Sequence, residues 1–109
     1  MSQVTTHVLD LVTGRPAAGI AVTLERIGAD AAPERIAAAE TDANGRVAAI
    51  GPEALPAGVY RLRFDTGGCH GGSAFFPEIS ISFRLADSEQ HYHVPLLLGP
   101  WGYTTYRGS

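Results

Sequence analysis

The sequence has no lysine, and eight arginines carry its whole positive charge against eleven acidic residues. Proteins that bind nucleic acids need clustered lysine and arginine to neutralise phosphates. With a formal net charge of −3, no nucleic-acid partner is expected. Cysteine is almost absent too, because Cys69 is alone. An intrachain disulfide and a thiolate zinc site are therefore excluded.

Long hydrophobic runs are also missing. No apolar stretch approaches the ~20 residues that a membrane-spanning helix needs. Residues 1–7 lack the basic start and apolar run of a secretory signal. We expect a cytoplasmic protein that does not contact a membrane. With 109 residues, of which 45% are hydrophobic, the chain has the size and composition of a single domain over residues 1–109.

Short runs of alternating apolar and polar residues make up most of the chain, separated by glycine and proline. Such alternation is typical of strands with one buried face. It predicts a mainly β fold, an antiparallel sandwich of about seven to eight strands. Residues 35–40 fit a strand or a helix equally well. The predicted strands are residues 4–9, 20–25, 59–64, 79–85, 90–98 and 103–106.

Three connecting segments have distinct chemistry. Asn44-Gly45 predicts a tight turn, because both residues tolerate positive φ. Residues 53–55 are expected to form one helical turn. Residues 67–72 contain four glycines, so they are expected to form a flexible loop.

His7 and His93 lie in the middle of predicted strands at opposite ends of the chain. An imidazole titrates near neutral pH and suits general acid–base chemistry, although a surface or structural histidine fits the spacing about as well. His91 projects from the same strand face as His93. A metal site formed by these three histidines is the less favoured alternative. His70, among glycines, is expected to be an exposed loop histidine.

Arg46 and the last four residues are further candidates. Arg46 follows the predicted turn and offers a planar donor fork that suits a carboxylate, an enolate or an imide. Alone, an arginine at such a position is usually just solvated. The segment from Tyr106 to Ser109 either ends a last strand or places a hydroxyl and the terminal carboxylate in a pocket.

Two terminal segments resemble the signature motifs of transthyretin-related proteins. The first runs from His7 to Gly19 and the second from Tyr92 to Ser109. Residues 41–46 and 75–78 resemble internal blocks of the same family, so the resemblance covers essentially the whole chain. The family has a hydrolase branch and a hormone-carrier branch. The first histidine, the arginine after the turn, His93 and the terminal tetrapeptide all match the hydrolase branch.

This resemblance implies a transthyretin-like β-sandwich with one short helix, assembled as a homotetramer with active sites in clefts at the dimer–dimer interface. It implies hydrolysis of 5-hydroxyisourate without a metal or cofactor. His7, Arg46, His93 and Ser109 would be catalytic, and His7, Arg46 and Tyr106 would bind the substrate. The alternative is a non-catalytic carrier of small molecules on the same fold, whose cleft would be largely apolar.

Association into a symmetric tetramer is also predicted from the apolar residues near the second motif. Leu96, Leu97, Leu98 and Trp101 provide more apolar surface than a small sandwich covers alone. A strand with such an end is a site for pairing with another chain when it lies at a sheet edge.

Overall fold

A computed structural model describes residues 3–28 and 30–108, and nearly all of their regular structure is β-strand. Within these residues, no helix is long and apolar enough to cross a membrane. The strands are β1 (Val4–Asp10), β2 (Arg15–Pro16), β3 (Ala21–Ile27), β4 (Glu34–Glu40), β5 (Arg46–Ile50), β6 (Gly58–Asp65), β7 (Glu78–Leu85), β8 (Tyr92–Leu98) and β9 (Tyr103–Thr105).

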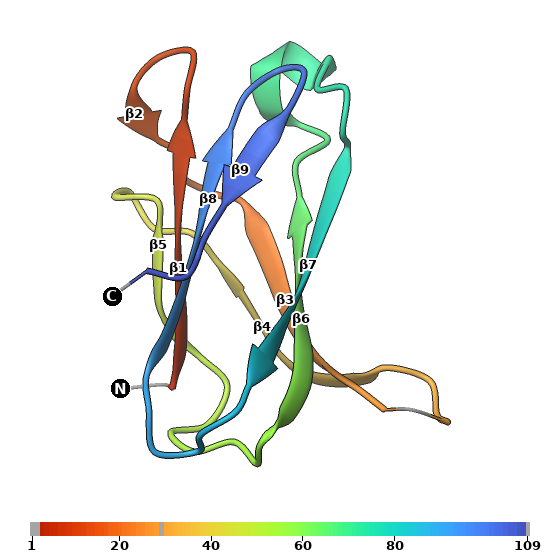
Figure 1. Cartoon of the computed structure of the whole chain (residues 1–109). Coiled ribbons are helices and arrows are strands. Elements are labelled where there is room, and N and C mark those ends of the chain that lie inside the picture. The colour runs from red at the N-terminus through yellow and green to blue at the C-terminus, as the bar shows by residue number, and fades with distance from the viewer. Residues whose placement is uncertain (1–2, 29, 109) are drawn as a thin grey trace.

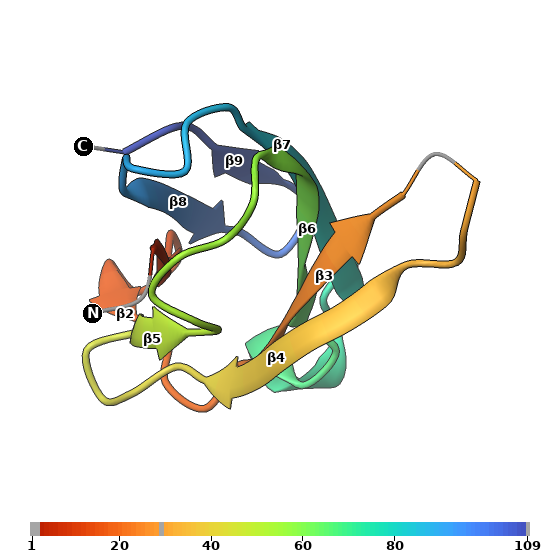
Figure 2. The same ribbon diagram turned by 90° about the horizontal axis from the view of Figure 1, so that it is seen from below.

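These strands form two sheets that lie face to face (Figures 1 and 2). The first sheet has the order β2-β1-β8-β9, and β5 also pairs with β1; the second has the order β4-β3-β6-β7. Strands β1 and β8 pair in parallel, whereas the other strand pairings within the described residues are antiparallel. The predicted mainly β sandwich is confirmed, with one parallel pair inside it.

The core lies between the two sheets and follows the alternation of the sequence. In β6, the side chains of Tyr60, Leu62 and Phe64 are fully buried, and the residues between them are not. Each such side chain contributes roughly 1.5–3 kcal/mol when it leaves water. In β8, on the opposite sheet, alternate residues are likewise buried: Tyr92, Val94, Leu96 and Leu98.

The structure corrects two predictions about connecting segments and decides a third. The expected helical turn at residues 53–55 is absent: Leu55 is buried, its N–H donates to Gln3, and the following Pro56 disfavours a helical conformation. The short helical segment is instead a 3₁₀ turn, η1, at Cys69–Gly72, where a flexible loop was expected. Residues 35–40, left open between strand and helix, pair with β3 as part of β4.

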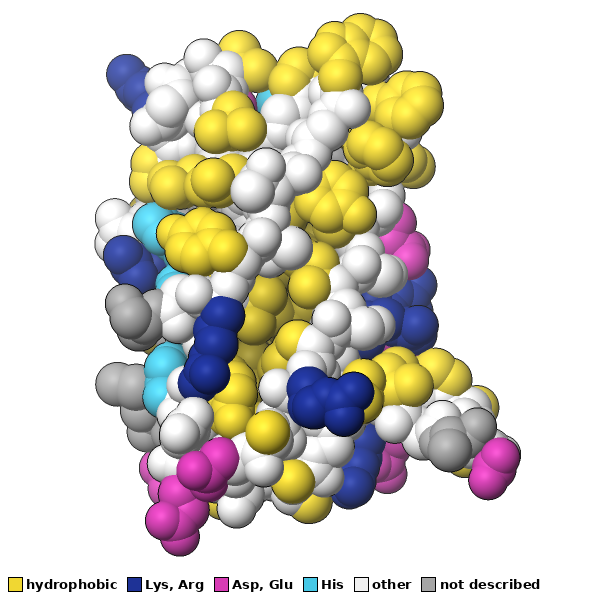
Figure 3. All heavy atoms as spheres, in the orientation of Figure 1, with side chains coloured by type: hydrophobic (Ala, Val, Ile, Leu, Met, Phe, Trp, Pro, Cys, Tyr) yellow, Lys and Arg dark blue, Asp and Glu magenta, His cyan; other side chains and the backbone are white. Residues whose placement is uncertain are grey.

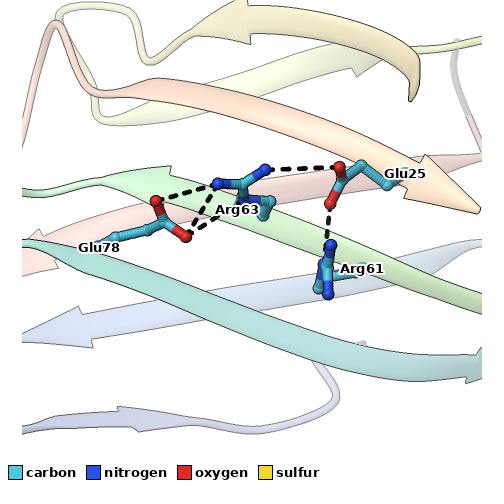
Figure 4. A network of polar contacts seen from close by, with 4 residues as sticks. All are labelled: Glu25, Arg61, Arg63 and Glu78. Atoms are coloured by element: carbon cyan, nitrogen blue, oxygen red, sulfur yellow. Dashed lines mark hydrogen bonds and ion pairs between the residues drawn. The ribbon is translucent and has the colours of Figure 1, made fainter. Parts of the chain in front are cut away.

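A network of four charged residues covers the outer face of the second sheet (Figure 4). Glu25 is 7% exposed; its carboxylate lies 2.8 Å from Arg61 Nε and 3.5 Å from Arg63 Nη1. Arg63 also donates to both carboxylate oxygens of Glu78 at 3.0 Å. Two arginines therefore compensate a carboxylate that is largely removed from water, as a buried charge requires.

Candidate active site

Strand β1 lies between β5 and β8, and this order brings the predicted residues to one face. His7 is the cross-strand partner of Arg46 on β5, and Thr5 is the parallel partner of His93 on β8. Because alternate residues of β1 point into the core, Thr5 and His7 point away from it. His7, Arg46 and His93 therefore share the outer face of the first sheet.

The turn before β5 fixes the position of Arg46. The Asp42 carboxylate accepts hydrogen bonds from the N–H groups of Arg46 at 3.0 Å and Asn44 at 2.8 Å. These bonds hold the pKa of Asp42 below its usual value. Gly45 has φ 72°, and a Cβ there would lie 2.4 Å from the carbonyl oxygen of Val8. That close approach explains the glycine at the turn.

A pocket of about 260 Å³ opens on this face. In Figure 3, histidine and arginine side chains gather on the left flank, where Figure 1 places β1, β5 and β8. An arginine, two histidines and two threonines are among its lining residues, and these are side chains that a carrier of apolar ligands does not need. Its lining residues are Thr5, Thr6, Arg46, Val47, Ala48, His91 and His93.

His93 is held at one ring nitrogen and free at the other. Its Nδ1 lies 2.9 Å from Thr5 Oγ1, whereas Nε2 has no hydrogen-bond partner among the described residues. Burial lowers the pKa of His93, and the nearby charges of Arg46, His7 and His91 lower it further. The neutral imidazole is therefore favoured at neutral pH, and its Nε2 can accept a proton.

His7 is turned toward the β5 turn. Its Nε2 lies 2.9 Å from the carbonyl oxygen of Asn44; since a carbonyl only accepts, Nε2 carries a proton and donates it. The three-histidine site considered above is not assembled. Within residues 3–28 and 30–108, no group of three or more His, Cys, Asp or Glu side chains is arranged to hold a metal ion.

The C-terminal segment packs directly on His93. The N–H of Gly108 donates to the His93 carbonyl oxygen at 2.8 Å, and a Cβ on Gly108 would lie 2.5 Å from His93 Cδ2. The Arg107 guanidinium lies 4.6 Å from the centre of the Tyr92 ring and donates to Gln90 Oε1 at 3.0 Å. These contacts anchor the segment along β8.

Tyr106, another predicted site residue, does not line this pocket in the protomer. Tyr106 is 57% exposed and lines a separate groove of about 290 Å³ with Ile81, Phe83 and Val94. Ser109 lies outside the described residues. The predicted contacts of Tyr106 and Ser109 with the substrate stay predictions.

Sequence reasoning missed Thr5 and described His70 wrongly. Thr5 Oγ1 lies 2.9 Å from both His91 Nε2 and His93 Nδ1, which links His91 to the site without a metal. The only available signal was that Thr5 shares a strand face with His7. His70 is not an exposed loop residue: it has φ 53°, and its buried Nε2 has no partner among the described residues.

Comparison with known proteins gives the family. The sequence model of the HIUase/Transthyretin family matches residues 4–108. The chain belongs to this family. A relative from Caulobacter vibrioides, named 5-hydroxyisourate hydrolase, is 40% identical over the full length of both chains. The resemblance found in the sequence is thereby confirmed.

Solved structures of the HIUase/Transthyretin family include an enzyme and a transthyretin. A 5-hydroxyisourate hydrolase from Klebsiella pneumoniae is 40% identical, with a TM-score of 0.84 over 97% of this chain and 98% of its own. A transthyretin from Sparus aurata is 33% identical, with a TM-score of 0.90 over 99% of this chain and 97% of its own. The fold is common to both, so the residues of the pocket must decide the function.

Proposed function

We propose that the protein is an enzyme that hydrolyses 5-hydroxyisourate to 2-oxo-4-hydroxy-4-carboxy-5-ureidoimidazoline in the degradation of urate. Relatives that carry this enzyme name at 40% identity or more support it. The observation that carries the proposal is the pocket that Arg46 and His93 line together. A carrier of apolar ligands has no use for a guanidinium and imidazoles at that position.

Hydrolysis needs a base for water and a positive group for the carbonyl oxygen. In the proposed reaction, Nε2 of His93 takes one proton from water while the water oxygen bonds to the lactam carbonyl carbon. Arg46 stabilises the negative charge that develops on the carbonyl oxygen. The carbon–nitrogen bond then breaks, and the proton held by His93 passes to the departing ring nitrogen.

His93 rather than His7 is assigned as the base because the two histidines differ in the hydrogen bonds of their Nε2 atoms. Nε2 of His93 is free of partners among the described residues, and the lowered pKa of His93 favours a neutral ring, which is the form that can act as a base. His7 uses its Nε2–H to bind Asn44, so we assign it to orienting the substrate beside Arg46. Contacts of Tyr106 and Ser109 with the substrate stay predictions.

The proposal includes a homotetramer in the cytoplasm. The pocket is open on the outer face of the first sheet, and a second dimer packed on that face would close it. Exclusion of water strengthens every charge interaction inside such a site.

The test is direct assay of the reaction. Urate oxidase generates 5-hydroxyisourate from urate, the protein is added, and the decay of the 5-hydroxyisourate absorbance is followed. We expect decay much faster than the spontaneous rate, and the same rate after treatment with a strong chelator. Decay at the spontaneous rate would support the carrier instead. Loss of activity after treatment with the chelator, followed by recovery on addition of zinc, would show that a metal takes part.

A further inference from the structure

A single hydroxyl group lies between two imidazoles at the edge of the pocket. Thr5 Oγ1 on β1 is 2.9 Å from Nδ1 of His93 on β8 and 2.9 Å from Nε2 of His91, which directly precedes β8. A hydroxyl has one proton to donate and two lone pairs to accept with. Thr5 can therefore donate to only one of the two rings, and it must accept from the other.

This constraint couples the proton positions of the two rings. When Thr5 accepts from Nδ1–H of His93 and donates to His91 Nε2, the Nε2 of neutral His93 carries a lone pair that faces outward. When Thr5 donates to His93 Nδ1 and accepts from Nε2–H of His91, neutral His93 carries its proton on Nε2 and cannot act as a base there. The first arrangement requires an unprotonated Nε2 on His91.

We propose that Thr5 and His91 are positioning residues that select the tautomer of His93 with its proton on Nδ1. The inference rests on the proposed function, because it supplies the base that hydrolysis needs. It is the arrangement by which a neighbouring group holds an imidazole in its useful tautomer, as in hydrolytic triads. Here a neutral hydroxyl backed by a second imidazole takes the place of a carboxylate.

The charges around His93 explain why the tautomer matters more than the ionisation state. The ionisable groups that act on it are Arg46 on β5, His7 on β1 and His91 just before β8, and all are positive when charged. They hold the pKa of His93 low together with burial, so the neutral ring is favoured. A neutral ring still has two tautomers, and the contact with the Thr5 hydroxyl bears on which of them forms.

The experiment compares substitutions that remove or keep the hydroxyl. Thr5→Val keeps the β-branched shape but has no hydroxyl. We expect kcat to fall at least about tenfold, though by less than the roughly 10²–10⁴-fold contribution of the base itself, with KM changed less than about twofold. Thr5→Ser should restore most of kcat. Thr23→Val, on a strand of the other sheet, is the matched control and should leave kcat unchanged.

Substitution of His91 tests the other half of the pair. His91→Phe removes the group that accepts the Thr5 proton, so Thr5 is left to donate to His93, and kcat should fall as in Thr5→Val. His91→Gln offers a side-chain oxygen that accepts from the hydroxyl, and it should retain more activity than His91→Phe. Equal activity of both variants would contradict the proposal.

A readout independent of activity is the tautomer itself. Nitrogen-15 NMR of the imidazole rings separates protonated from unprotonated ring nitrogens. In the unmodified protein near neutral pH, His93 should have its proton on Nδ1, and in Thr5→Val and His91→Phe a large share of it should move to Nε2. A wild-type His93 with its proton on Nε2, or one that does not change in these variants, would overturn the inference even if the protein is an active hydrolase. Absence of hydrolysis by the wild-type protein would instead refute the proposed function.

Discussion

The ring of His93 has a different neighbour on each side. Thr5 binds Nδ1, and Gly108 packs against Cδ2 so closely that a methyl group would not fit. These two contacts leave Nε2 as the nitrogen that can meet a substrate. The predictions at the scale of single residues concern this ring and the charges beside it.

His93→Ala should reduce turnover of 5-hydroxyisourate by about 10²–10⁴-fold, the usual contribution of a general acid–base group, and His7→Ala should also lower turnover, because it removes the side chain assigned to orienting the substrate. The matched control is His70→Ala, because His70 lies in η1 away from the pocket and should keep full turnover. Steady-state kinetics and thermal unfolding of all three variants give the answer. An equal loss in all three would point to general destabilisation.

The pH dependence of kcat/KM should reflect the low pKa of His93. A base with a lowered pKa stays unprotonated further into the acid range, so the acid limb should lie below the ordinary histidine value of about 6.5. The charge of Arg46 is one cause of the lowering. Arg46→Gln should therefore move the acid limb to higher pH, in addition to any loss of rate.

The measurement is kcat/KM from pH 5 to 9 for both proteins, corrected for spontaneous decay of the substrate. An acid limb that stays in place or moves to lower pH in Arg46→Gln would contradict this electrostatic account.

Gly108→Ala should reduce kcat while the fold stays intact. The added Cβ would lie 2.5 Å from His93 Cδ2, so the imidazole or the C-terminal segment must move, and small displacements of a catalytic group are costly. We expect a loss of about tenfold or more. Thermal unfolding within a few degrees of wild type would separate this effect from loss of stability, and unchanged kcat would show that the contact does not position the ring.

At the scale of elements, β1 organises the site because it has a neighbour on each side. Strand β5 supplies Arg46 through one pairing, and β8 supplies His93 through the other. The turn before β5 is pressed against β1: the N–H of Val8 donates to the Gly45 carbonyl at 2.8 Å. The placement of Arg46 therefore depends on the packing of this turn.

Gly45→Ala should destabilise the protein much more than Gly14→Ala. Both glycines have φ near 70°, which costs a residue with a Cβ about 1 kcal/mol or somewhat more. Gly14 has open space around it, whereas a Cβ on Gly45 meets Val8 and Pro16 within 3 Å. We expect a loss of roughly 3 kcal/mol or more for Gly45→Ala, and urea unfolding of both variants measures it. Equal losses of unfolding free energy in the two variants would show that the turn rearranges to accommodate the Cβ at little cost.

At the scale of the whole molecule, an apolar patch lies at one end of the sandwich (upper right in Figure 3). Aromatic rings contact each other there, with centroids 4.9 Å apart for Phe75 and Phe76 and 6.1 Å apart for Phe75 and Trp101. Trp101 is 76% exposed. Exposed patches of this kind are typical of interfaces.

The exposed apolar surface is not formed by the residues from which the tetramer was predicted. Leu96 and Leu98 are buried in the core, and β8 is not an edge strand because β1 and β9 flank it. Only Trp101 and the half-buried Leu97 remain of the four predicted residues. The exposed apolar side chains are instead Leu11, Val12, Phe75, Phe76, Trp101, Tyr103 and Tyr106.

Light scattering after size-exclusion chromatography should give about four times the 11.5 kDa protomer mass, because a symmetric tetramer would cover both the apolar patch and the face with the pocket. Trp101→Glu should shift the population toward smaller species, since it places a charge in the patch. A monomer mass at micromolar concentration would remove the interface that the proposed function places over the site.

The sequence by itself determined the fold class, the buried faces of the strands and the family. Alternation is a local property, and it states which residues of a strand face the core: Tyr60, Leu62 and Phe64 follow it without exception. The chemistry of Asn44-Gly45 is equally local and placed the turn before Arg46. Motif likeness then supplied His7, Arg46 and His93 as candidates.

Only the tertiary structure decided how these residues meet. Thr5 and His93 are 88 positions apart, and their contact depends on the order and the parallel direction of β1 and β8, which a local pattern does not encode. The same holds for Gly108 against His93. Tyr106, which the motif resemblance assigned to substrate binding, lines another groove of the protomer, and its contact with the substrate stays a prediction. Local patterns determine which residues of a strand face the core, whereas strand order and direction determine which strands lie side by side. The pocket is formed by residues of neighbouring strands, so only the tertiary structure shows it.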